Sequence, residues 1–416
     1  MKTNSLIKQV VAGLAVAAFI GVGSTRAALK DTTEAGIFDN VPDARATQTG
    51  GGRQVNVAPQ LKQKHRIKLN LAAGVEHMAE RDRIELSAGG DFVWVGRIVG
   101  EPLSRVTLAS RKGAVAGVID RPMENGNEVY QLDPLPSGNS LLRLVVDAVA
   151  NQCQVVVPPP RVRFGADFPP ATAANPAVID LMLVYTPATR ARYQNGESGN
   201  SGILAKLSQA VADANSAYQN SQVFITLNVA QISEVAYTES GSLLTDLNRL
   251  AASGDNYMDE VHVWRDQVGA DLVALICEST DYSGIAYLMD FPDPGFAPFG
   301  FSAVRSSSLS GLTLHHELGH NMGCDHDRAH SAGGGAYPYS YGYGNCTNDG
   351  TGFRTVMAYQ CDNAVVPRIN YFSNPGVNFS GLPTGVASET APAASADNAR
   401  SLNNTAFYVQ AFISTL

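Results

Sequence analysis

The sequence predicts an α+β protein in which a small β-rich domain precedes a twisted mixed sheet with helices packed on it. Three features predict this architecture. Short apolar alternations separated by turn residues fill residues 67–157, strands and helices alternate from residue 178 onward, and a proline-rich stretch separates the two regions. Closely spaced short strands favour an antiparallel β domain, whereas alternating strands and helices favour a sheet covered by helices.

The first 27 residues have the pattern of an export signal. Lys2 and Lys8 give a positive start, an apolar run follows at residues 10–22, and small residues lead to Ala27, after which we expect cleavage. The apolar run is too short to cross a bilayer, which takes about 20 residues. We therefore expect a secreted protein, and the alternative is a short anchor or a buried helix.

Residues 28–157 are expected to form the β-rich domain. The part up to about Leu61 is rich in Thr, Gly, Ala and Asp, which predicts irregular structure. Beyond Ile67, alternations such as those at residues 92–95 and 115–119 predict strands. This region contains no cluster of catalytic residue types.

Residues 158–177 have the composition of a linker. Prolines at 158–160 and 169–170 surround Arg161 and Arg163. Proline disfavours a helix and favours an extended, exposed chain, and exposed segments are common sites of proteolysis. We expect activation cleavage in this region, and the alternative is an interdomain linker that is never cut.

Residues 178–416 are expected to form the second domain. Near-continuous apolar runs predict buried strands, and apolar residues at helical spacing predict helices. The expected strands are 179–185, 223–229, 272–277, 285–289 and 301–305, and the expected helices are 201–218, 243–252, 257–268 and 312–322.

The charge of the chain argues against two classes of partner. The formal net charge is −8, and the region from Ala177 onward has 10 Lys and Arg against 22 Asp and Glu, which gives −12. Nucleic acid requires clustered Lys or Arg, and anionic lipid attracts polybasic segments. We therefore expect neither nucleic acid nor a membrane as a partner.

Five cysteines fit an oxidising compartment. Four of them, Cys277, Cys324, Cys346 and Cys361, lie in the second domain and allow two disulfides in three pairings. Because Cys346 and Cys361 bracket a short segment, we expect them to pair and to leave Cys277 for Cys324. Cys153 is left over.

Three histidines in one short segment predict a metal site. His316 and His320 are four residues apart on a predicted helix, so their imidazoles project from the same face. Two neutral imidazoles can hold one Zn²⁺ with bonds of about 2.0–2.1 Å. Gly323 tolerates a positive φ, which lets the helix stop and the chain return His326 as a third ligand. Three protein ligands leave one position open, as in a catalytic rather than a structural zinc site.

Glu317 lies beside the first ligand on a neighbouring helix face. Zinc lowers the pKa of a bound water towards about 7, and we expect Glu317 to take a proton from that water and deliver it to the leaving amine. The alternative is a helix with scattered surface histidines, which the glycine and the third histidine at the required offsets disfavour. His315 and His330 do not fit the pattern and are expected to be ordinary helix-face or loop histidines.

Met357 lies in the segment Thr-Val-Met-Ala-Tyr at residues 355–359. A methionine in an apolar segment is usually only part of a core. Its position downstream of the long histidine motif favours the other interpretation, in which it packs beneath the three ligands as in the Met-turn of metzincins.

These motifs resemble those of the metzincin zinc endopeptidases, and within that clan those of the bacterial peptidyl-Asp metalloendopeptidases and related reprolysin-like enzymes. The resemblance extends from about Val178 to the C-terminus. It includes Asp327 after the third histidine and, less sharply, residues 371–375 and 396–400. It implies a metzincin-type catalytic domain, a C-terminal subdomain with a Met-turn, an active site between two subdomains, and a β-rich pro-domain.

Tyr359 departs from the pattern of animal reprolysins, which usually have proline two residues after the methionine. In this respect the segment looks more like astacins and serralysins, where this tyrosine contacts the metal or the developing oxyanion. Tyr359 is therefore a candidate stabiliser of the transition state. The alternative is that its ring only packs and its hydroxyl caps a backbone group.

The resemblance also implies cleavage on the amino side of aspartate, sometimes glutamate, which requires a cation in the pocket for the residue after the scissile bond. Arg368 is the first candidate and Arg354 the second. The charge of −12 repels acidic substrates at long range, but a buried arginine can pair bidentately with a carboxylate.

Cys153 lies just before the linker and is a candidate latency switch, because a thiolate is a strong zinc ligand and can occupy the open position. Matrixins and animal reprolysins use such a switch, but their flanking motif is absent around Cys153. The alternative is a buried, unpaired thiol.

We therefore predict a secreted zinc-dependent endopeptidase with one catalytic zinc ion, made as a precursor. We expect a monomer whose partners are polypeptide substrates and its own pro-domain, and no pattern decides for or against an added calcium ion. The alternative from another class is a secreted binding or adhesive protein with an inactive metzincin scaffold, which the intact Glu317 argues against. A structural zinc domain is disfavoured because no cysteine is among the predicted ligands.

Overall fold

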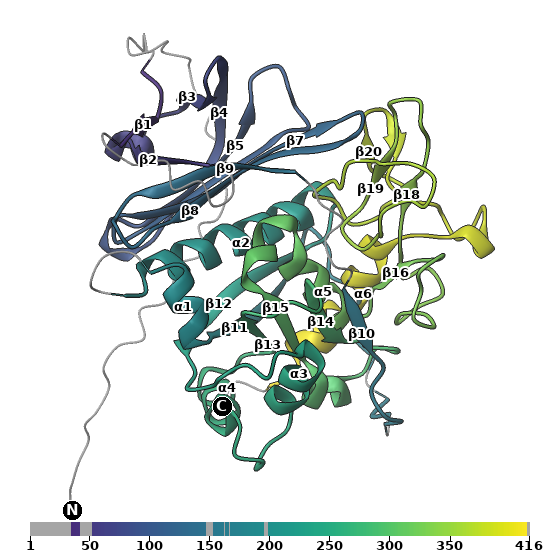
Figure 1. The fold of residues 1–416 in the computed structure, drawn as a ribbon. Coiled ribbons are helices and arrows are strands. Elements are labelled where there is room, and N and C mark those ends of the chain that lie inside the picture. Colours follow the sequence, from purple (N-terminus) through teal and green to yellow (C-terminus); the bar gives the residue numbers. More distant parts are fainter. Residues whose placement is uncertain are drawn as a thin grey trace, which may run out of the picture. The chain divides into compact units, whose positions relative to one another are not determined.

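Two sheets contact one long helix from different sides in the computed structural model of the chain (Figure 1). The helix is α2 (Ser201–Asn220). By their contacts, residues Gly36–Leu416 form one unit. The structure describes residues 35–41, 52–146, 153–161, 163–165, 167–194 and 199–413. The export signal predicted at residues 1–27 lies outside the described residues.

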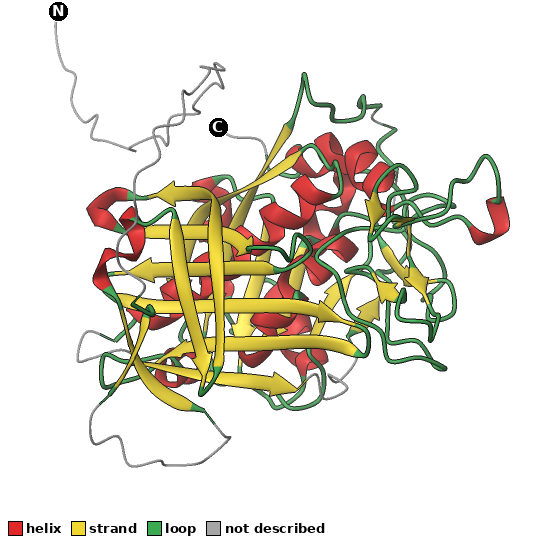
Figure 2. Cartoon of the chain, turned by 90° about the horizontal axis from the view of Figure 1, so that it is seen from above, coloured by secondary structure: helices red, strands yellow, loops and turns green. Residues whose placement is uncertain are grey.

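The first sheet has nine antiparallel strands in the order β1-β2-β9-β8-β7-β6-β5-β4-β3. Figure 2 shows strands lying side by side in front of the helices. They are β1 (Phe38–Asn40), β2 (Arg53–Val57), β3 (Arg66–Ala72), β4 (Val75–Leu86), β5 (Phe92–Ile98), β6 (Arg105–Arg111), β7 (Ala114–Met123), β8 (Gly126–Pro134) and β9 (Ser140–Val146). The two outer strands also meet, because the Ile37 N–H donates to the Lys68 carbonyl over 3.0 Å. We call residues 36–146 the N-terminal region. A β-rich region is present here, as predicted.

The prediction of irregular structure up to about Leu61 is wrong for the described residues. β1 and β2 pair with each other, β2 also pairs with β9, and a short 3-10 helix, η1 (Pro59–Gln63), follows. Val55 and Leu61 are fully buried in the core of this region. Pairing with strands distant in the sequence therefore overrides the weak local preference of this polar segment.

The second sheet has six strands in the order β10-β14-β15-β13-β11-β12 and is mixed, as predicted. They are β10 (Gln154–Val156), β11 (Ala177–Tyr185), β12 (Ile225–Glu234), β13 (Leu272–Cys277), β14 (Gly284–Tyr287) and β15 (Phe301–Arg305). Strand β14 runs antiparallel to β15, whereas the other pairings of the sheet are parallel. We call residues 177–413 the C-terminal region.

The helices of the C-terminal region agree with the predicted ones, apart from two that the sequence reading missed. The predicted helices are α2, α3 (Leu243–Ala251), α4 (Asp259–Val268) and α5 (Thr313–Asn321), and the missed ones are α1 (Pro187–Arg192) and α6 (Asn398–Gln410). Short elements complete the region: η3 (Pro294–Phe299), η4 (Ser306–Gly311), η5 (Pro392–Ala394), β16 (Asp325–Asp327), β17 (Tyr341–Gly342), β18 (Gly344–Asn345), β19 (Phe353–Arg354), β20 (Asn378–Phe379) and β21 (Leu382–Pro383).

Strand β10 corrects the expected end of the β-rich domain at residue 157. Its three residues pair in parallel with β14, from Gln154 opposite Ile285 to Val156 opposite Tyr287. The strand therefore belongs to the sheet of the C-terminal region. The linker that follows has no helix among its described residues. Most of them are exposed, but the Arg161 side chain is only 8% exposed.

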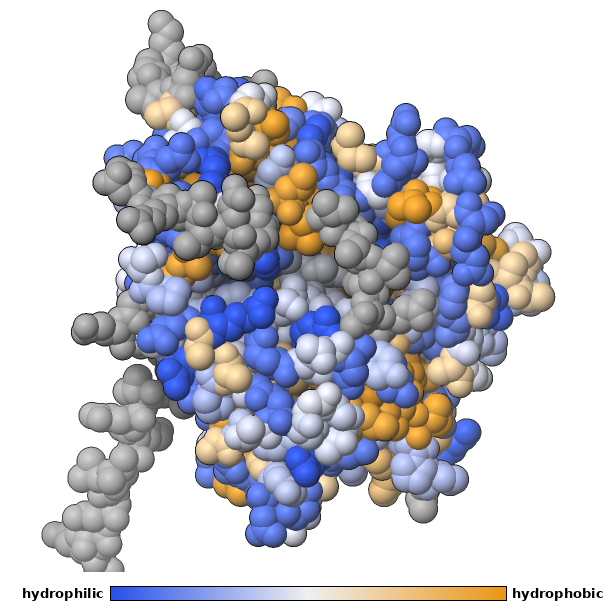
Figure 3. Space-filling view, viewed as in Figure 1, coloured by the Kyte–Doolittle hydropathy of each residue, from blue (hydrophilic) through white to orange (hydrophobic). Residues whose placement is uncertain are grey.

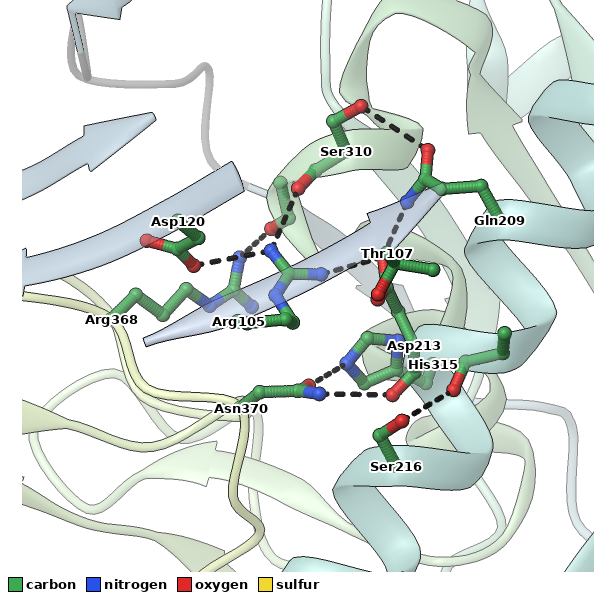
Figure 4. Close-up of polar contacts among 12 residues, drawn as sticks. Arg105, Thr107, Asp120, Gln209, Asp213, Ser216, Ser310, His315, Arg368 and Asn370 are labelled. Carbon is green, nitrogen blue, oxygen red and sulfur yellow. Dashed lines mark hydrogen bonds and ion pairs between the residues drawn. The ribbon is translucent and has the colours of Figure 1, made fainter. Parts of the chain in front are cut away.

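Helix α2 is buried on nearly all sides because the N-terminal region covers the face that points away from the second sheet. Small residues permit the close approach: Ala212 packs against Val93, Val95 and Ala109. Charged side chains flank these contacts. Arg105 pairs with Asp213 across 2.5 Å, as Figure 4 shows. A second buried pair joins Lys206 to Asp133 across 3.0 Å.

The cysteines follow the predicted pairing only in part. Cys346 and Cys361 form a disulfide, as predicted. The pairing of Cys277 with Cys324 is wrong, because both thiols are free and buried in different surroundings. The sulfur of Cys277 faces the Val304 carbonyl in the sheet, whereas that of Cys324 faces the Asn398 carbonyl at the start of α6.

No helix of the described residues combines the length and the apolar character needed to cross a membrane. The face drawn in Figure 3 is mostly hydrophilic, with separate apolar patches. The large apolar side chains are gathered in two main clusters, one in each region.

Candidate metal centre

A glycine turn after helix α5 brings the third histidine back to the first two. The helix ends at Asn321, and Gly323 has a φ of 92°. A Cβ atom on Gly323 would lie 2.5 Å from the Cβ of Ala336, so glycine is required both for the backbone conformation and for space. Strand β16 then carries His326 back towards α5, as the sequence predicts.

The ring nitrogens of His316, His320 and His326 form a compact triangle. The Nε2 atom of His320 is 3.1 Å from that of His316 and 3.1 Å from that of His326, and the third side is 3.2 Å. All three side chains are buried. The structure therefore brings together the three predicted ligands.

The tautomers of these histidines favour a cation between them. His316 Nδ1 bonds to the Val356 carbonyl over 2.8 Å, and His320 Nδ1 bonds to the Cys324 carbonyl over 2.7 Å. A carbonyl only accepts, so Nδ1 of His320 carries the proton and its Nε2 presents a lone pair, whereas Nδ1 of His316 contacts both the Val356 carbonyl and, over 2.9 Å, Nη2 of Arg368. Burial lowers the pKa of His320 to about 4 and that of His326 to about 3, which keeps the rings neutral. Lone pairs at these distances repel unless a cation lies among them, and the site fits a metal ion.

Glu317 is fully buried next to this triangle. Neither carboxylate oxygen has a nitrogen or oxygen partner among the described residues, and its polar neighbour is the thiol of Cys153. Burial raises the pKa of Glu317 to about 8. Its position depends on Gly284 in β14, because a Cβ atom there would lie 2.3 Å from Oε1 of Glu317. The sequence reading missed Gly284, since no local pattern links it to the histidine motif.

Met357 packs against helix α5 between the two helical histidines. A Cβ atom on Gly319 would lie 2.7 Å from the Met357 sulfur, so the glycine of the motif makes room for the thioether. The segment turns at this point, because the Ala358 N–H donates to the Thr355 carbonyl over 3.0 Å. Met357 is fully buried.

Comparisons with known proteins agree with this geometry. The sequence model Reprolysin_5, of metallopeptidase family M12, matches residues 175–373. A peptidyl-Asp metalloendopeptidase of Stenotrophomonas maltophilia (strain R551-3) is 32% identical over 360 residues, which cover 82% of this chain and 81% of the relative. The chain belongs to metallopeptidase family M12.

Two further relatives carry the same printed name. The one from Xanthomonas campestris pv. campestris is 29% identical over 436 residues, which cover 99% of this chain and 98% of the relative. The one from Pseudomonas fragi is 30% identical over 200 residues, which cover 48% of this chain and 99% of the relative. This M12 peptidase is therefore a metalloendopeptidase, and hence a hydrolase.

Tyr359 lies against the third histidine of the peptidase. Its ring centre is 4.3 Å from that of His326. Its backbone N–H donates to Asp327 over 2.9 Å, and Asp327 also bonds to His330 Nδ1 over 2.9 Å. Its hydroxyl donates to the Cys153 carbonyl. Tyr359 is thus next to the candidate metal site, and its hydroxyl is engaged by the residue that precedes β10.

Cys153 also reaches the site. Its sulfur, a ring nitrogen of His316 and a carboxylate oxygen of Glu317 all lie within 4.8 Å of one another. The residue is buried, and burial raises the pKa of its thiol well above the usual value. The structure therefore places the predicted switch residue beside Glu317 and beside one of the three candidate ligands.

Arg368 and Arg354 line a cavity of about 480 Å³ beside His316. Arg368 donates from Nη1 to the Gly311 carbonyl over 2.9 Å and from Nη2 to the Val356 carbonyl that His316 also contacts. Arg354 donates from Nη1 to the Ala358 carbonyl over 3.1 Å. Both candidate cations therefore lie close to the histidines, and Arg368 is the nearer.

The N-terminal region closes one side of this cavity. The side chain of Asn127 in β8 accepts from the Arg368 N–H over 2.7 Å and donates to the Arg368 carbonyl over 3.0 Å. The same amide donates to Asp120, which pairs with Arg105 across 3.1 Å (Figure 4). The sequence reading missed Asn127, because only the packing of the two regions brings it to the site.

The two remaining histidines of the segment stay outside the triangle, as predicted. His315 is buried, and its Nε2 atom bonds to the side chain of Asn370 over 3.0 Å. The Asn370 amide in turn donates to the Asp213 carbonyl over 2.9 Å, which connects α5 to α2 (Figure 4). His330 pairs with Asp327 across 2.9 Å.

Proposed function

We propose that this metalloendopeptidase is a secreted zinc enzyme, made as an inactive precursor, that hydrolyses internal peptide bonds on the amino side of aspartate or glutamate. The observation that carries the proposal is the triangle of the three histidine Nε2 atoms beside a buried carboxylate that has no nitrogen or oxygen partner among the described residues. The export pattern of residues 1–27 supports secretion.

His316, His320 and His326 would hold the zinc ion. Neutral imidazoles suit zinc, whereas calcium prefers oxygen ligands. When bound, zinc lowers the pKa of a water molecule towards about 7 and polarises the scissile carbonyl. The Nδ1 bonds to the Val356 and Cys324 carbonyls hold two of the rings in the orientation that this requires.

Glu317 would act as the general base and then as the general acid. Both of its oxygens are available, because neither has a nitrogen or oxygen partner in the described structure. The carboxylate accepts a proton from the attacking water, holds it, and delivers it to the nitrogen of the departing amine. Met357, packed on Gly319, would form the Met-turn that supports the histidines.

Cys153 would keep the precursor inactive, with its sulfur in the position that the water needs. The grouping of its sulfur with His316 and Glu317 supports this role over that of an ordinary buried thiol. The same residue engages the Tyr359 hydroxyl through its carbonyl. Departure of Cys153 would therefore free both the open metal position and the hydroxyl, which can then stabilise the oxyanion.

The substrate preference is proposed from two observations. Relatives that the chain matches over most of its length are named peptidyl-Asp metalloendopeptidases. Arg368 is fixed beside His316 by carbonyl contacts, at the wall of the cavity. A guanidinium oriented in this way can bind the carboxylate of the residue after the scissile bond, and Arg354 is the second candidate.

The decisive experiment maps the cuts that the activated enzyme makes in a mixed peptide pool by mass spectrometry, with the Glu317→Ala variant as the control. We expect chelator-sensitive cuts in which aspartate is enriched as the residue directly after the cut. We also expect about one zinc per mature chain. Cuts that persist in the control or after zinc removal would overturn the mechanism. Enrichment of bulky apolar residues would overturn only the acidic preference.

A further inference from the structure

The linker is attached to the C-terminal region on both sides of a short exposed stretch. On the upstream side, Arg161 pairs with Asp290, and its guanidinium lies 4.5 Å from the ring centre of Phe291 and 4.8 Å from that of Phe296. The Phe164 N–H then donates to Asp293 over 2.7 Å. The upstream half of the linker is therefore bound to the surface around η3.

The downstream half of the linker is bound to helix α6. The ring of Phe168 contacts that of Tyr408 edge to face, with 4.9 Å between the ring centres. The Ala171 N–H donates to the Asn403 carbonyl over 2.8 Å, and β11 begins shortly afterwards. A chain cut between the two attachments would keep its new N-terminus on α6.

Asp167 lies between these attachments and is the only acidic residue from Cys153 to Ala177. The residue is exposed and belongs to neither a helix nor a strand. Within the described part of the chain, no hydrogen bond or ion pair holds its carboxylate. Asp349, by comparison, is bonded to Thr347 and Thr351 in the segment that the disulfide closes.

We propose that the enzyme activates itself by hydrolysing the peptide bond on the amino side of Asp167. This inference rests on the proposed preference for that side of aspartate. Water supplies a hydroxyl to the carbonyl carbon of residue 166 and a proton to the nitrogen of Asp167, and the C–N bond between them breaks. The products are a carboxylate that ends the precursor segment and a mature chain that begins with Asp167.

The cut is made by another copy of the enzyme. Within one precursor, Cys153 occupies the site beside His316 and Glu317, and β10 lies along β14. Asp167 cannot enter the same site while its own neighbours in sequence remain attached to Asp293 and α6. Processing should therefore show a lag that shortens with protein concentration and disappears when mature enzyme is added.

The arginines of the linker are the competing sites. Arg161 is sheltered, with an 8% exposed side chain, so a trypsin-like protease would have to extract it first. Arg163 is exposed and lies 4.0 Å from the ring centre of Phe291. A cut after Arg163 by another protease would start the mature chain at Phe164, three residues before Asp167, so the two routes give products of different mass.

The test compares the purified precursor with its Asp167→Asn variant and with the control variant Arg163→Gln, each seeded with a trace of mature wild-type enzyme. Intact mass and N-terminal sequencing identify the product. We expect a mature chain that begins at Asp167 in the wild type and in Arg163→Gln, and processing slowed by about 10–100-fold in Asp167→Asn. A mature chain that begins elsewhere, or Asp167→Asn processed at the wild-type rate, would overturn the inference.

A second measurement separates this inference from the proposed function. Mature enzyme is given two synthetic peptides with the sequence of residues 160–173, one with Asp and one with Asn at position 167, and an unrelated peptide with a single aspartate. If neither aspartate peptide is cut before the aspartate, the proposed preference itself is wrong. If both are cut but the precursor matures at another bond, only the activation site is wrong.

Discussion

The interface along α2 and the metal centre both bury charged and polar groups, but they differ in how these groups are compensated. Along α2, Arg105 meets Asp213 and Lys206 meets Asp133. At the centre, the Glu317 oxygens lack nitrogen or oxygen partners among the described residues, and the three Nε2 atoms face one another. Burying polar groups without partners is costly. We therefore infer that the metal centre, where partners are missing, serves catalysis, and that the α2 interface, where charges are paired, stabilises the fold.

The largest effect is expected from Glu317→Gln, which removes the oxygen that can accept a proton but keeps the shape of the side chain. Because general acid and base catalysis contributes about 10²–10⁴-fold, we expect kcat of the activated enzyme to fall by that factor. Because no nitrogen or oxygen partner among the described residues holds the carboxyl group, the melting temperature should stay the same or rise. Kinetics and calorimetry check this, and a Glu317→Gln variant that unfolds at a markedly lower temperature than the wild type would contradict the comparison.

The α2 interface should respond in the opposite way. Asp213→Ala removes one of the two carboxylates that pair with the buried Arg105, along with the acceptor of Thr107, and leaves Asp120 as the remaining ion-pair partner. Breaking a buried pair costs up to about 3–5 kcal/mol. We expect the precursor to lose that much unfolding free energy in urea, while the mature enzyme, without the N-terminal region, loses far less. Equal losses in precursor and mature enzyme would mean that the pair does not join the two regions.

Gly284→Ala tests how closely the metal centre is packed. The added Cβ would lie 2.3 Å from Glu317 Oε1, so the carboxylate must move. A displacement of about 1 Å can cost about 10²-fold in rate, and we expect kcat to fall by roughly 10–100-fold with little change in KM. Combined with Glu317→Gln, the substitution should add almost nothing. Additive losses would show that Gly284 acts through another residue.

The smallest effect concerns Asp271, a buried group that is compensated only in part, less than the pairs along α2 and more than Glu317. It accepts from the Asp180 N–H over 2.9 Å, yet burial raises its pKa to about 7. The folded state then binds more protons than the unfolded state between about pH 4 and 7, so stability falls as pH rises through this range. We expect a loss of about 1–2 kcal/mol after solvent screening, which Asp271→Asn abolishes. Urea titrations from pH 4 to 8 measure it, and equal slopes for both proteins would refute it.

The sequence predicted the centre because its geometry is local. The spacing of His316 and His320 sets their common face, and Gly323 sets the turn that returns His326. Cys346 and Cys361 could likewise be paired from their short separation.

Features that depend on distant contacts could not be predicted from the sequence. Gly284 matters only because β14 lies over Glu317, and Asn127 only because the N-terminal region packs on the cavity. Residues 154–156 resemble any short apolar strand, and only the free edge of β14 assigns them to the second sheet. Cys277 and Cys324 were wrongly paired by elimination, since cysteines can also remain buried as thiols.

The charged lining of α2 has a consequence for the enzyme after maturation. If leucines and phenylalanines held the N-terminal region in place, its removal would expose a large apolar patch on the remaining domain. Such patches promote aggregation. Here the uncovered face would present Lys206, Asp213 and Ser208 between alanines, and water can solvate it at once. If the N-terminal region leaves as proposed, the newly exposed face of α2 would therefore not promote aggregation of the mature enzyme.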